Sequence, residues 1–187
     1  MEAPYVDLGQ TPTWRLTPLA PPAIRPLLAA RGYRAIERSL PQVCRLHAGF
    51  AADAEVRIFP RPTPAWIEAF RTHSPVPPRH RETMQRMLGA IATPVGFAFV
   101  EEAGQPMAMA IGAVEGDHMG LFDVLVMPAA RRRGLARRVT ESLYAWARAH
   151  GARFAYLQVV ATNEAALPLY AGQGFRTVYG YEYLLPP

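Results

Sequence analysis

Lysine is absent from this chain of 187 residues, because all twenty basic residues are arginine. The absence excludes Schiff-base chemistry on a lysine and the Walker-type nucleotide site, which uses a phosphate-loop lysine. Cysteine occurs once, at Cys44, so an internal disulfide is excluded and we expect a small core residue there. The five histidines and the single cysteine show no metal-ligand spacing, and we expect no metal site.

Long apolar runs are absent as well. No stretch approaches the ~18 apolar residues of a membrane span, and the first ten residues lack the basic start and apolar run of a signal peptide. We therefore expect a cytoplasmic protein with no membrane partner. Half of the residues are hydrophobic and 19% are charged, which is the composition of a globular chain. The length suits one good-sized domain, with at most a small appendage.

The positive charge is concentrated in one short segment. Without it, fifteen arginines balance fifteen acidic residues, and the net charge of +5 comes from five arginines, at positions 131, 132, 133, 137 and 138. A protein that binds nucleic-acid backbones would need a flanking basic stripe, so we do not expect a nucleic-acid partner.

The hydrophobic pattern predicts helices and strands in a mixed α/β order. Helices are expected over 65–73 and 79–91, the second with a core face of Met84, Met87, Leu88 and Ile91. Three strands over 94–102, 105–117 and 118–127, joined by short turns, predict an antiparallel meander. A helix over 134–150, a strand over 153–162 buried on both faces, a short helix capped by Asn163 and a closing strand over 175–185 complete the pattern.

The chain also resembles itself at a shift of 142 residues. Ala23–Arg34 aligns without gaps on Ala165–Arg176, with six identities in twelve residues and Tyr33 opposite Phe175. The first 48 or so residues are therefore expected to be a degenerate copy of the C-terminal strand, helix and strand. Chance similarity in a composition rich in alanine, leucine and arginine is the alternative.

The arginine-rich segment has the form of an anion site. A strand ends at Pro128, a turn with Gly134 and Ala136 follows, and a helix begins there. Backbone N–H groups in such a turn and the positive end of the helix dipole bind phosphate, and small residues let a diphosphate approach the main chain. The alternative is a solvated basic helix start that binds nothing.

Two ordered motifs resemble the GNAT superfamily of N-acetyltransferases. Arg131-x-x-Gly134-x-Ala136, after "LVMP", is similar to that family's acetyl-CoA diphosphate loop. The family's second signature is similar to a later set, which consists of Asn163, Ala166, Leu169, Tyr170, Gly174 and Phe175. The resemblance runs from about residue 60 to the C-terminus. It implies the GNAT fold, an α+β fold whose mixed sheet is splayed at the acetyl-CoA site and flanked by helices.

The resemblance also implies roles for individual residues. Pantetheine would pair with the end of the third meander strand, and the diphosphate would lie in the following turn. The cofactor-binding residues implied are Val124, Leu125, Val126, Met127, Arg131, Arg132, Arg133, Gly134, Leu135, Ala136, Arg137 and Asn163. Asn163 is similar to a residue that touches the cofactor arm or caps the next helix. Tyr170 is similar to the general acid beside the cofactor sulfur, with core packing as its alternative role.

The general base is less defined. Asp123 is the acidic residue within the third meander strand, where an unpaired buried carboxylate would be costly. It would serve as base or substrate ligand, or it would form a salt bridge to a nearby arginine. On this basis we divide the chain into a degenerate GNAT-like segment (1–48) and an acetyltransferase domain (49–187).

The sequence predicts an enzyme that transfers the acetyl group of acetyl-CoA to a primary amine by direct attack in a ternary complex. The alternative is a non-catalytic acyl-CoA-binding regulatory module, which the presence of Tyr170 disfavours. The amine is not identified by the sequence. The closing strand is a candidate for pairing across a homodimer.

Overall fold

The computed structural model describes residues 2–187, so the first residue of the expected N-terminal segment lies outside the described part. The chain forms two compact units. One unit runs from Cys44 to Leu157, and the other combines the chain up to Val43 with the chain from Gln158 onward. The division expected from the sequence, a repeated segment up to residue 48 followed by an acetyltransferase domain, stays a prediction.

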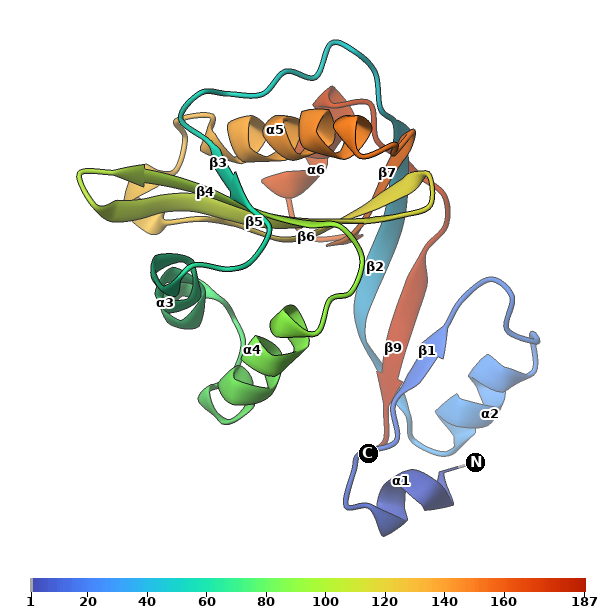
Figure 1. The fold of residues 1–187 in the computed structure, drawn as a ribbon. Helices are drawn as coiled ribbons and strands as arrows, with labels where there is room; N and C mark the ends of the chain where they lie inside the picture. Colours follow the sequence, from blue (N-terminus) through green and yellow to red (C-terminus); the bar gives the residue numbers. More distant parts are fainter. Residues whose placement is uncertain (1) are drawn as a thin grey trace. The chain divides into compact units, whose positions relative to one another are not determined.

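The unit 44–157 is built on a mixed sheet (Figure 1). The predicted meander is confirmed, since neighbouring members of β4 (Val95–Glu102), β5 (Gln105–Glu115) and β6 (His118–Val126) pair antiparallel. β3 (Arg57–Phe59) joins β4 at one edge, and the start of β7 (Phe154–Val160) pairs in parallel with β6 at the other. The two-residue turn between β4 and β5 has positive φ at Ala103 and Gly104, which matches the right-handed twist of a hairpin. The predicted mixed α+β fold is confirmed.

Helix α5 (Leu135–Ala149) covers one face of this sheet. Leu135, Val139 and Leu143 recur every four residues on its buried side. Gly96 and Gly112 face each other across β4 and β5, and a Cβ on either would come within 3.2 Å of Leu143 Cδ2. The glycine pair therefore lets α5 pack close to the sheet and holds it at a fixed height.

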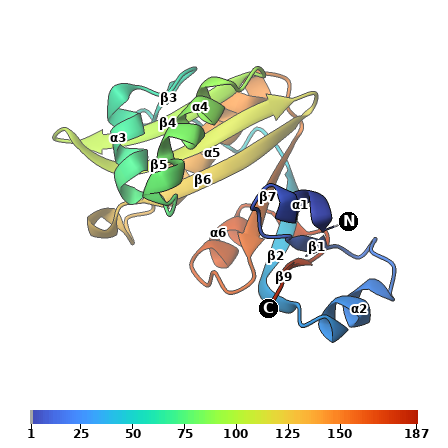
Figure 2. The ribbon, with the colours of Figure 1, turned by 90° about the horizontal axis from the view of Figure 1, so that it is seen from below.

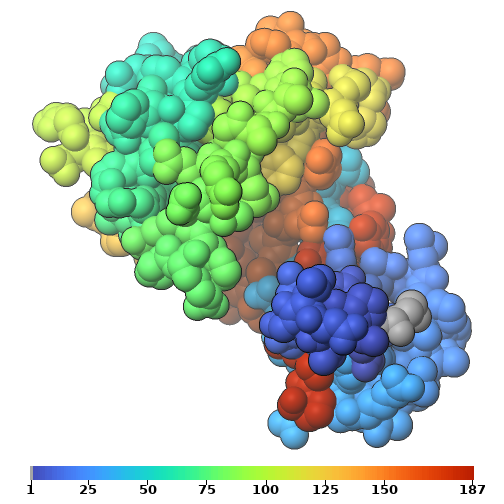
Figure 3. Space-filling view, turned by 60° about the horizontal axis from the view of Figure 1, so that its bottom comes forward, coloured from blue at the N-terminus to red at the C-terminus, as the bar shows by residue number. Residues whose placement is uncertain are grey.

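Helices α3 (Pro64–His73) and α4 (Arg81–Gly89) lie on the opposite face and form the outer layer there (Figures 2 and 3). The Thr63 hydroxyl caps α3 by accepting the N–H of Trp66 at 3.2 Å. Trp66 is fully buried, and its indole N–H donates to the Ala98 carbonyl. The expected core face of the second helix is only partly right, because Leu88 is buried whereas Met87 is 59% exposed.

The other unit contains α1 (Ala3–Asp7) and a small antiparallel sheet. Its middle strand, β9 (Tyr181–Leu185), pairs with β1 (Trp14–Leu16) on one side and β2 (Arg34–Arg45) on the other. The predicted closing strand is thus shorter than expected, since residues 176 and 177 form a separate strand, β8 (Arg176–Thr177), which also pairs with β2. Because both edges of β9 are occupied, this strand offers no free edge for the dimer that the sequence suggested.

This unit holds both members of the internal repeat. Helices α2 (Ile24–Ala30) and α6 (Ala166–Gly172) each have seven residues, and their bounds differ by the 142-residue shift found in the sequence. Both are followed at the matching position by a glycine in the left-handed region, Gly32 with φ 82° and Gly174 with φ 84°. The two segments therefore end their helices in the same way.

The hydrogen bonds around the two helix ends also match. The N–H of Tyr33 donates to the Leu28 carbonyl at 3.0 Å, and the N–H of Phe175 donates to the Tyr170 carbonyl at 3.0 Å. Leu28 and Tyr170, which occupy equivalent positions in the two copies, are both buried, so the two helices pack through equivalent residues. The repeated sequence thus has a repeated local structure.

Candidate functional site

Strand β6 separates from β7 after a short stretch of pairing. The parallel register runs from His118 with Phe154 to Gly120 with Tyr156, and in the described residues it goes no further. β6 continues to Val126, bonded to β5 alone, and its register with β5 shifts around Asp123, whose φ is 49°. A bulge of this kind bends the strand and increases its twist. It leaves the outer backbone groups of Val124 to Val126 free to bind an extended ligand.

The turn after β6 presents unpaired backbone N–H groups. Following the short helix η2 (Pro128–Ala130), Arg132 and Gly134 both have left-handed φ values, 64° and 75°. Gly134 is the N-cap of α5, and because it has no side chain it cannot cap the first N–H groups of the helix. Among residues 2–187, no hydrogen bond is found from the N–H groups of residues 132 to 137. Together with the α5 dipole, these groups form a cradle of the kind that can bind an anion.

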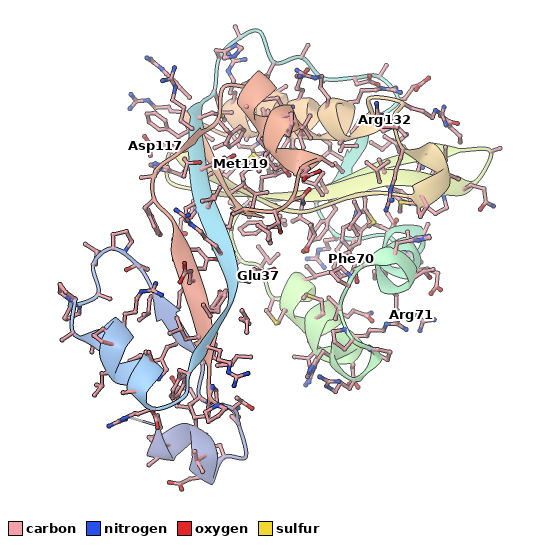
Figure 4. The ribbon with its side chains drawn as sticks, turned by 180° about the vertical axis from the view of Figure 1, so that it is seen from behind. Glu37, Phe70, Arg71, Asp117, Met119 and Arg132 are labelled. Carbon is pink, nitrogen blue, oxygen red and sulfur yellow. The ribbon has the colours of Figure 1, made fainter. Side chains whose placement is uncertain are left out.

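The arginines of this segment divide into two sets. Arg133 is bound to Glu102 at 2.6 Å, and Arg137 is bound to Glu141 at 2.8 Å one turn along α5. Arg138 is bound to the carboxylates of Asp53 and Glu55, in the loop between β2 and β3, and is only 29% exposed. Arg131 and Arg132 are exposed and have no ion pair in the described part of the chain; Figure 4 shows Arg132 on the loop before α5. Two arginines of the five are thus uncommitted to a protein carboxylate.

Asp123 occupies the bulge itself. No ion pair or hydrogen bond of its carboxylate is found within the described chain, so the salt bridge considered from the sequence has no counterpart here. Its side chain remains exposed, yet desolvation by surrounding protein raises the pKa of the Asp123 carboxyl above its ordinary value. A raised pKa makes this carboxylate a stronger proton acceptor.

The other two expected site residues belong to the second unit. Tyr170 is buried in α6, and burial raises the pKa of its phenol to about 12. The hydroxyl therefore keeps its proton at every physiological pH. Asn163 lies two residues before Ala165, the N-cap of α6, and its Oδ1 accepts the N–H of Ala166, the first residue of that helix, at 3.0 Å. That bond supports the helix-capping alternative for Asn163, and its contact with a cofactor stays a prediction.

A protein-family model matches residues 28–184 of the chain, and its description is "Probable histone acetyltransferase Rv0428c C-terminal". The match spans most of the chain. The chain belongs to this family. No curated protein matches it. It is a GNAT-type acyltransferase, as the two sequence motifs predicted.

Solved structures of GNAT proteins share the fold. A GCN5-related N-acetyltransferase from Sphaerobacter thermophilus matches with a TM-score of 0.74 at 19% identity over 95% of this chain. A GCN5-related N-acetyltransferase from Kribbella flavida matches with a TM-score of 0.66 at 19% identity, over the whole chain and 72% of its own. A tandem GNAT protein of the clavulanic acid pathway has a TM-score of 0.69 at 13% identity, over 96% of this chain and 65% of its own. The acyltransferase chain spans 61% of the Sphaerobacter structure.

Two further properties of this acyltransferase follow from its described residues. They contain no helix long and apolar enough to cross a membrane, and no cluster of three or more potential metal ligands. Cys44 is buried, as expected, and burial raises the pKa of its thiol to about 11. A raised pKa leaves little of the reactive thiolate, which agrees with the expected role of Cys44 as a core residue.

Sequence reasoning missed the aromatic residues at the fork between β6 and β7. The run 153–162 was expected to be buried on both faces, but burial alternates along β7 and Tyr156 is 40% exposed. Phe122, just before Asp123, is 41% exposed. The available signal was Tyr156 itself, a large polar-tipped residue between the small or aliphatic Ala155 and Leu157. The acyltransferase therefore has aromatic as well as acidic groups at the bulge.

Proposed function

We propose that this acyltransferase transfers the acetyl group of acetyl-CoA to a primary amine by direct attack in a ternary complex. The observation that carries the proposal is the set of unpaired N–H groups at residues 132–137, at the start of a 15-residue helix and next to the bulge of β6. Coenzyme A has the two matching features, a diphosphate for the cradle and an amide-bearing pantetheine arm for the strand edge.

We assign the cofactor-binding roles from the backbone groups and arginine side chains of residues 124–137 that have no protein partner within the described chain. The main chain of Val124 to Val126, with Met127 at the end of the strand, pairs with pantetheine. N–H groups of the turn bind the diphosphate, and Arg131 and Arg132 add charge-assisted hydrogen bonds to phosphate. Arg133 and Arg137 contribute mainly through their backbone, because their guanidinium groups are bound to carboxylates. Asn163 supports the site by fixing the start of α6.

The chemistry needs one base and one acid. The neutral amine nitrogen attacks the thioester carbonyl carbon, the carbon–sulfur bond breaks, and the electron pair leaves on the coenzyme A sulfur. Tyr170 donates a proton to that thiolate, and Asp123, directly or through water, accepts the proton that the amine loses. Positioning both reactants contributes several kcal/mol to the rate, and no covalent enzyme intermediate is required.

The Tyr170→Phe variant tests this assignment. Removing the hydroxyl should lower kcat by roughly 10²- to 10⁴-fold, the usual contribution of one positioned acid or base, and leave the affinity for coenzyme A unchanged. Tyr179→Phe is the matched control, because Tyr179 is an exposed tyrosine of the same unit. A Tyr170→Phe enzyme as fast as the parent would remove the proton-donor role. Binding of coenzyme A without transfer to any amine would favour the non-catalytic module.

We infer further that the N-terminal segment, up to about residue 48, is a degenerate copy of the C-terminal strand, helix and strand. The matching helix bounds, left-handed glycines and hydrogen bonds support this relation. The position of Tyr170 is occupied by Leu28, which has no proton to donate. The copy therefore serves as structure and takes no part in the chemistry.

A further inference from the structure

Two aromatic rings are exposed at the fork of β6 and β7. Phe122 and Tyr156 are 41% and 40% exposed, and their rings meet edge to face with centroids 6.3 Å apart and planes at 90°. Aromatic side chains usually dominate cores and interfaces, so a neighbouring pair left in water is a candidate for a binding surface.

The face on which they lie is fixed by the register. Phe122 is opposite Ile111, and Ile111 is opposite Phe97, so the three side chains lie on one face of the sheet. The ring of Phe97 packs edge to face against Trp66 of α3, with the ring centroids 5.1 Å apart. Met119 lies on the other face, because a Cβ on Gly112 would meet both Met119 and Leu143 of α5. The aromatic pair is thus on the α3 side of the sheet. Figure 2 shows α3 and α4 over β4 and β5, with β6 beside them.

Both aromatic side chains pack directly against the backbone of Gly120. A Cβ at this position would lie 2.5 Å from two ring atoms of Phe122 and 2.8 Å from the Tyr156 hydroxyl oxygen. With the two rings in these positions, residue 120 has room for the hydrogen of glycine but not for a Cβ atom. The glycine fixes the pair at the last bonded step of the β6–β7 register, where the two strands begin to diverge.

The residue that follows Phe122 in the chain carries a negative charge. Asp123 follows Phe122 in the bulge, and its carboxylate has no ion-pair partner within residues 2–187. Aromatic faces and a carboxylate together attract an ammonium group and cover the hydrocarbon attached to it. A carboxylate next to that ammonium would be repelled by Asp123.

We propose that Phe122 and Tyr156, packed against Gly120, bind the hydrocarbon stem of the acceptor while Asp123 receives its ammonium group, so that the enzyme selects amines with no carboxylate on the amine-bearing carbon. This specificity rests on the transfer reaction proposed above. It assigns to the aromatic pair a role in acceptor binding that is separate from cofactor binding and from proton transfer.

A matched pair of acceptors tests the selection. Pentylamine and norleucine share an unbranched hydrocarbon stem, and norleucine adds one carboxylate on the amine-bearing carbon. The wild-type enzyme should have a kcat/KM at least about tenfold higher for pentylamine, a difference typical of one unfavourable group in a binding site. Equal values, or a preference for norleucine, would overturn the charge selection.

Variants test the residues. Phe122→Ala and Gly120→Ala should each raise KM for pentylamine about tenfold or more, with unchanged affinity for coenzyme A. Tyr5→Ala is the matched control, since Tyr5 is an exposed aromatic residue on α1 of the other unit, and it should change neither quantity. An unchanged KM in Phe122→Ala would overturn the assignment of the aromatic pair.

Calorimetry separates this proposal from the transfer reaction. Pentylamine is titrated into the wild-type and Phe122→Ala proteins, each saturated with coenzyme A, so that no turnover is needed. We expect the variant to bind pentylamine at least about tenfold more weakly. Weakened binding in an enzyme that transfers to no amine would reject the proposed reaction and keep the acceptor site. Equal binding to both proteins, or binding to neither, would reject the acceptor site.

Discussion

Arg138 donates two hydrogen bonds to the carboxylate of Asp53, from Nε at 2.7 Å and from a terminal nitrogen at 2.9 Å. The loop that carries Asp53 is held to α5 a second time, because the backbone N–H of Asp53 donates to the Ser142 hydroxyl at 2.9 Å. Arg138 is therefore a positioning residue that ties the first turns of α5 to the loop between β2 and β3. It is the arginine of the cluster with the least solvent exposure among those in ion pairs.

This pair predicts a pH-dependent stability. Side-chain hydrogen bonds from Arg138, then the N–H of Glu55, hold the pKa of the Asp53 carboxyl below its ordinary value. A lowered folded-state pKa stabilises the protein above the unfolded-state pKa of ~3.9, and the contribution is lost as pH falls through the folded-state value. Asp53→Asn should lower the free energy of unfolding by about 1 kcal/mol at pH 7, with the difference shrinking in acid.

Urea unfolding at pH 7 and at pH 3 measures this difference. Glu55→Gln is the control, because Glu55 also binds Arg138 but is 68% exposed, so its effect should be smaller. A difference between the Asp53→Asn and parent proteins that persists undiminished at pH 3 would show that the hydrogen-bonded carboxylate is not its source.

Gly134→Ala should weaken coenzyme A binding more than it weakens the fold. The left-handed φ of 75° costs an alanine roughly 1 kcal/mol, and the added Cβ enters open space on the cradle. Gly104→Ala is a matched control with φ 74°, also in open space but in the β4–β5 turn. Both variants should lose similar stability in thermal unfolding, and Gly134→Ala alone should bind coenzyme A several-fold more weakly. Equal affinities of the Gly134→Ala and Gly104→Ala proteins for coenzyme A would show that the diphosphate does not bind at Gly134.

Arg131 and Arg132 should matter more for the cofactor than Arg137 does. Each uncommitted guanidinium offers charge-assisted hydrogen bonds to phosphate, whereas Arg137 is bound to Glu141. Arg131→Ala and Arg132→Ala should each weaken coenzyme A binding by about tenfold, and Arg137→Ala by less. The loss should diminish as salt is raised from low to physiological concentration. A larger effect from Arg137 would contradict the division of the cluster.

Leu28→Ala should destabilise the protein without altering the chemistry. Leu28 is 1% exposed and packs with Leu16, Tyr33 and Leu184. Truncating a buried leucine costs about 2–5 kcal/mol. Thermal unfolding should show this loss, while kcat per folded molecule stays at the parent value at a temperature where the variant is folded. A reduced kcat under those conditions would give the N-terminal segment a catalytic role.

Local pattern predicted much of the fold. The strand runs and short turns of the meander, the four-residue spacing on α5 and the diphosphate-loop motif each depend on residues close in sequence. The repeat was visible as well, because it needs only comparison of the chain with itself. Arg133, Arg137 and Arg138 could not be sorted from Arg131 and Arg132, since the carboxylates that bind them lie partly in distant loops and strands.

The aromatic pair shows the same limit. Sequence alternation does not reveal where β6 and β7 stop pairing, and that point decides whether Tyr156 is covered or exposed. The packing of both rings against Gly120 depends on register between two strands separated by a whole helix. Long-range register, rather than residue preference, sets both features.

The central claim is that N–H groups around Gly134 bind the diphosphate of coenzyme A. Calorimetric titration of the wild-type protein with 3′-dephospho-coenzyme A, which has the diphosphate, and with 4′-phosphopantetheine, which lacks it, tests that claim most directly. We predict that dephospho-coenzyme A binds roughly 100-fold more tightly, since several charge-assisted hydrogen bonds depend on the diphosphate. Equal affinities for the two ligands would contradict the account.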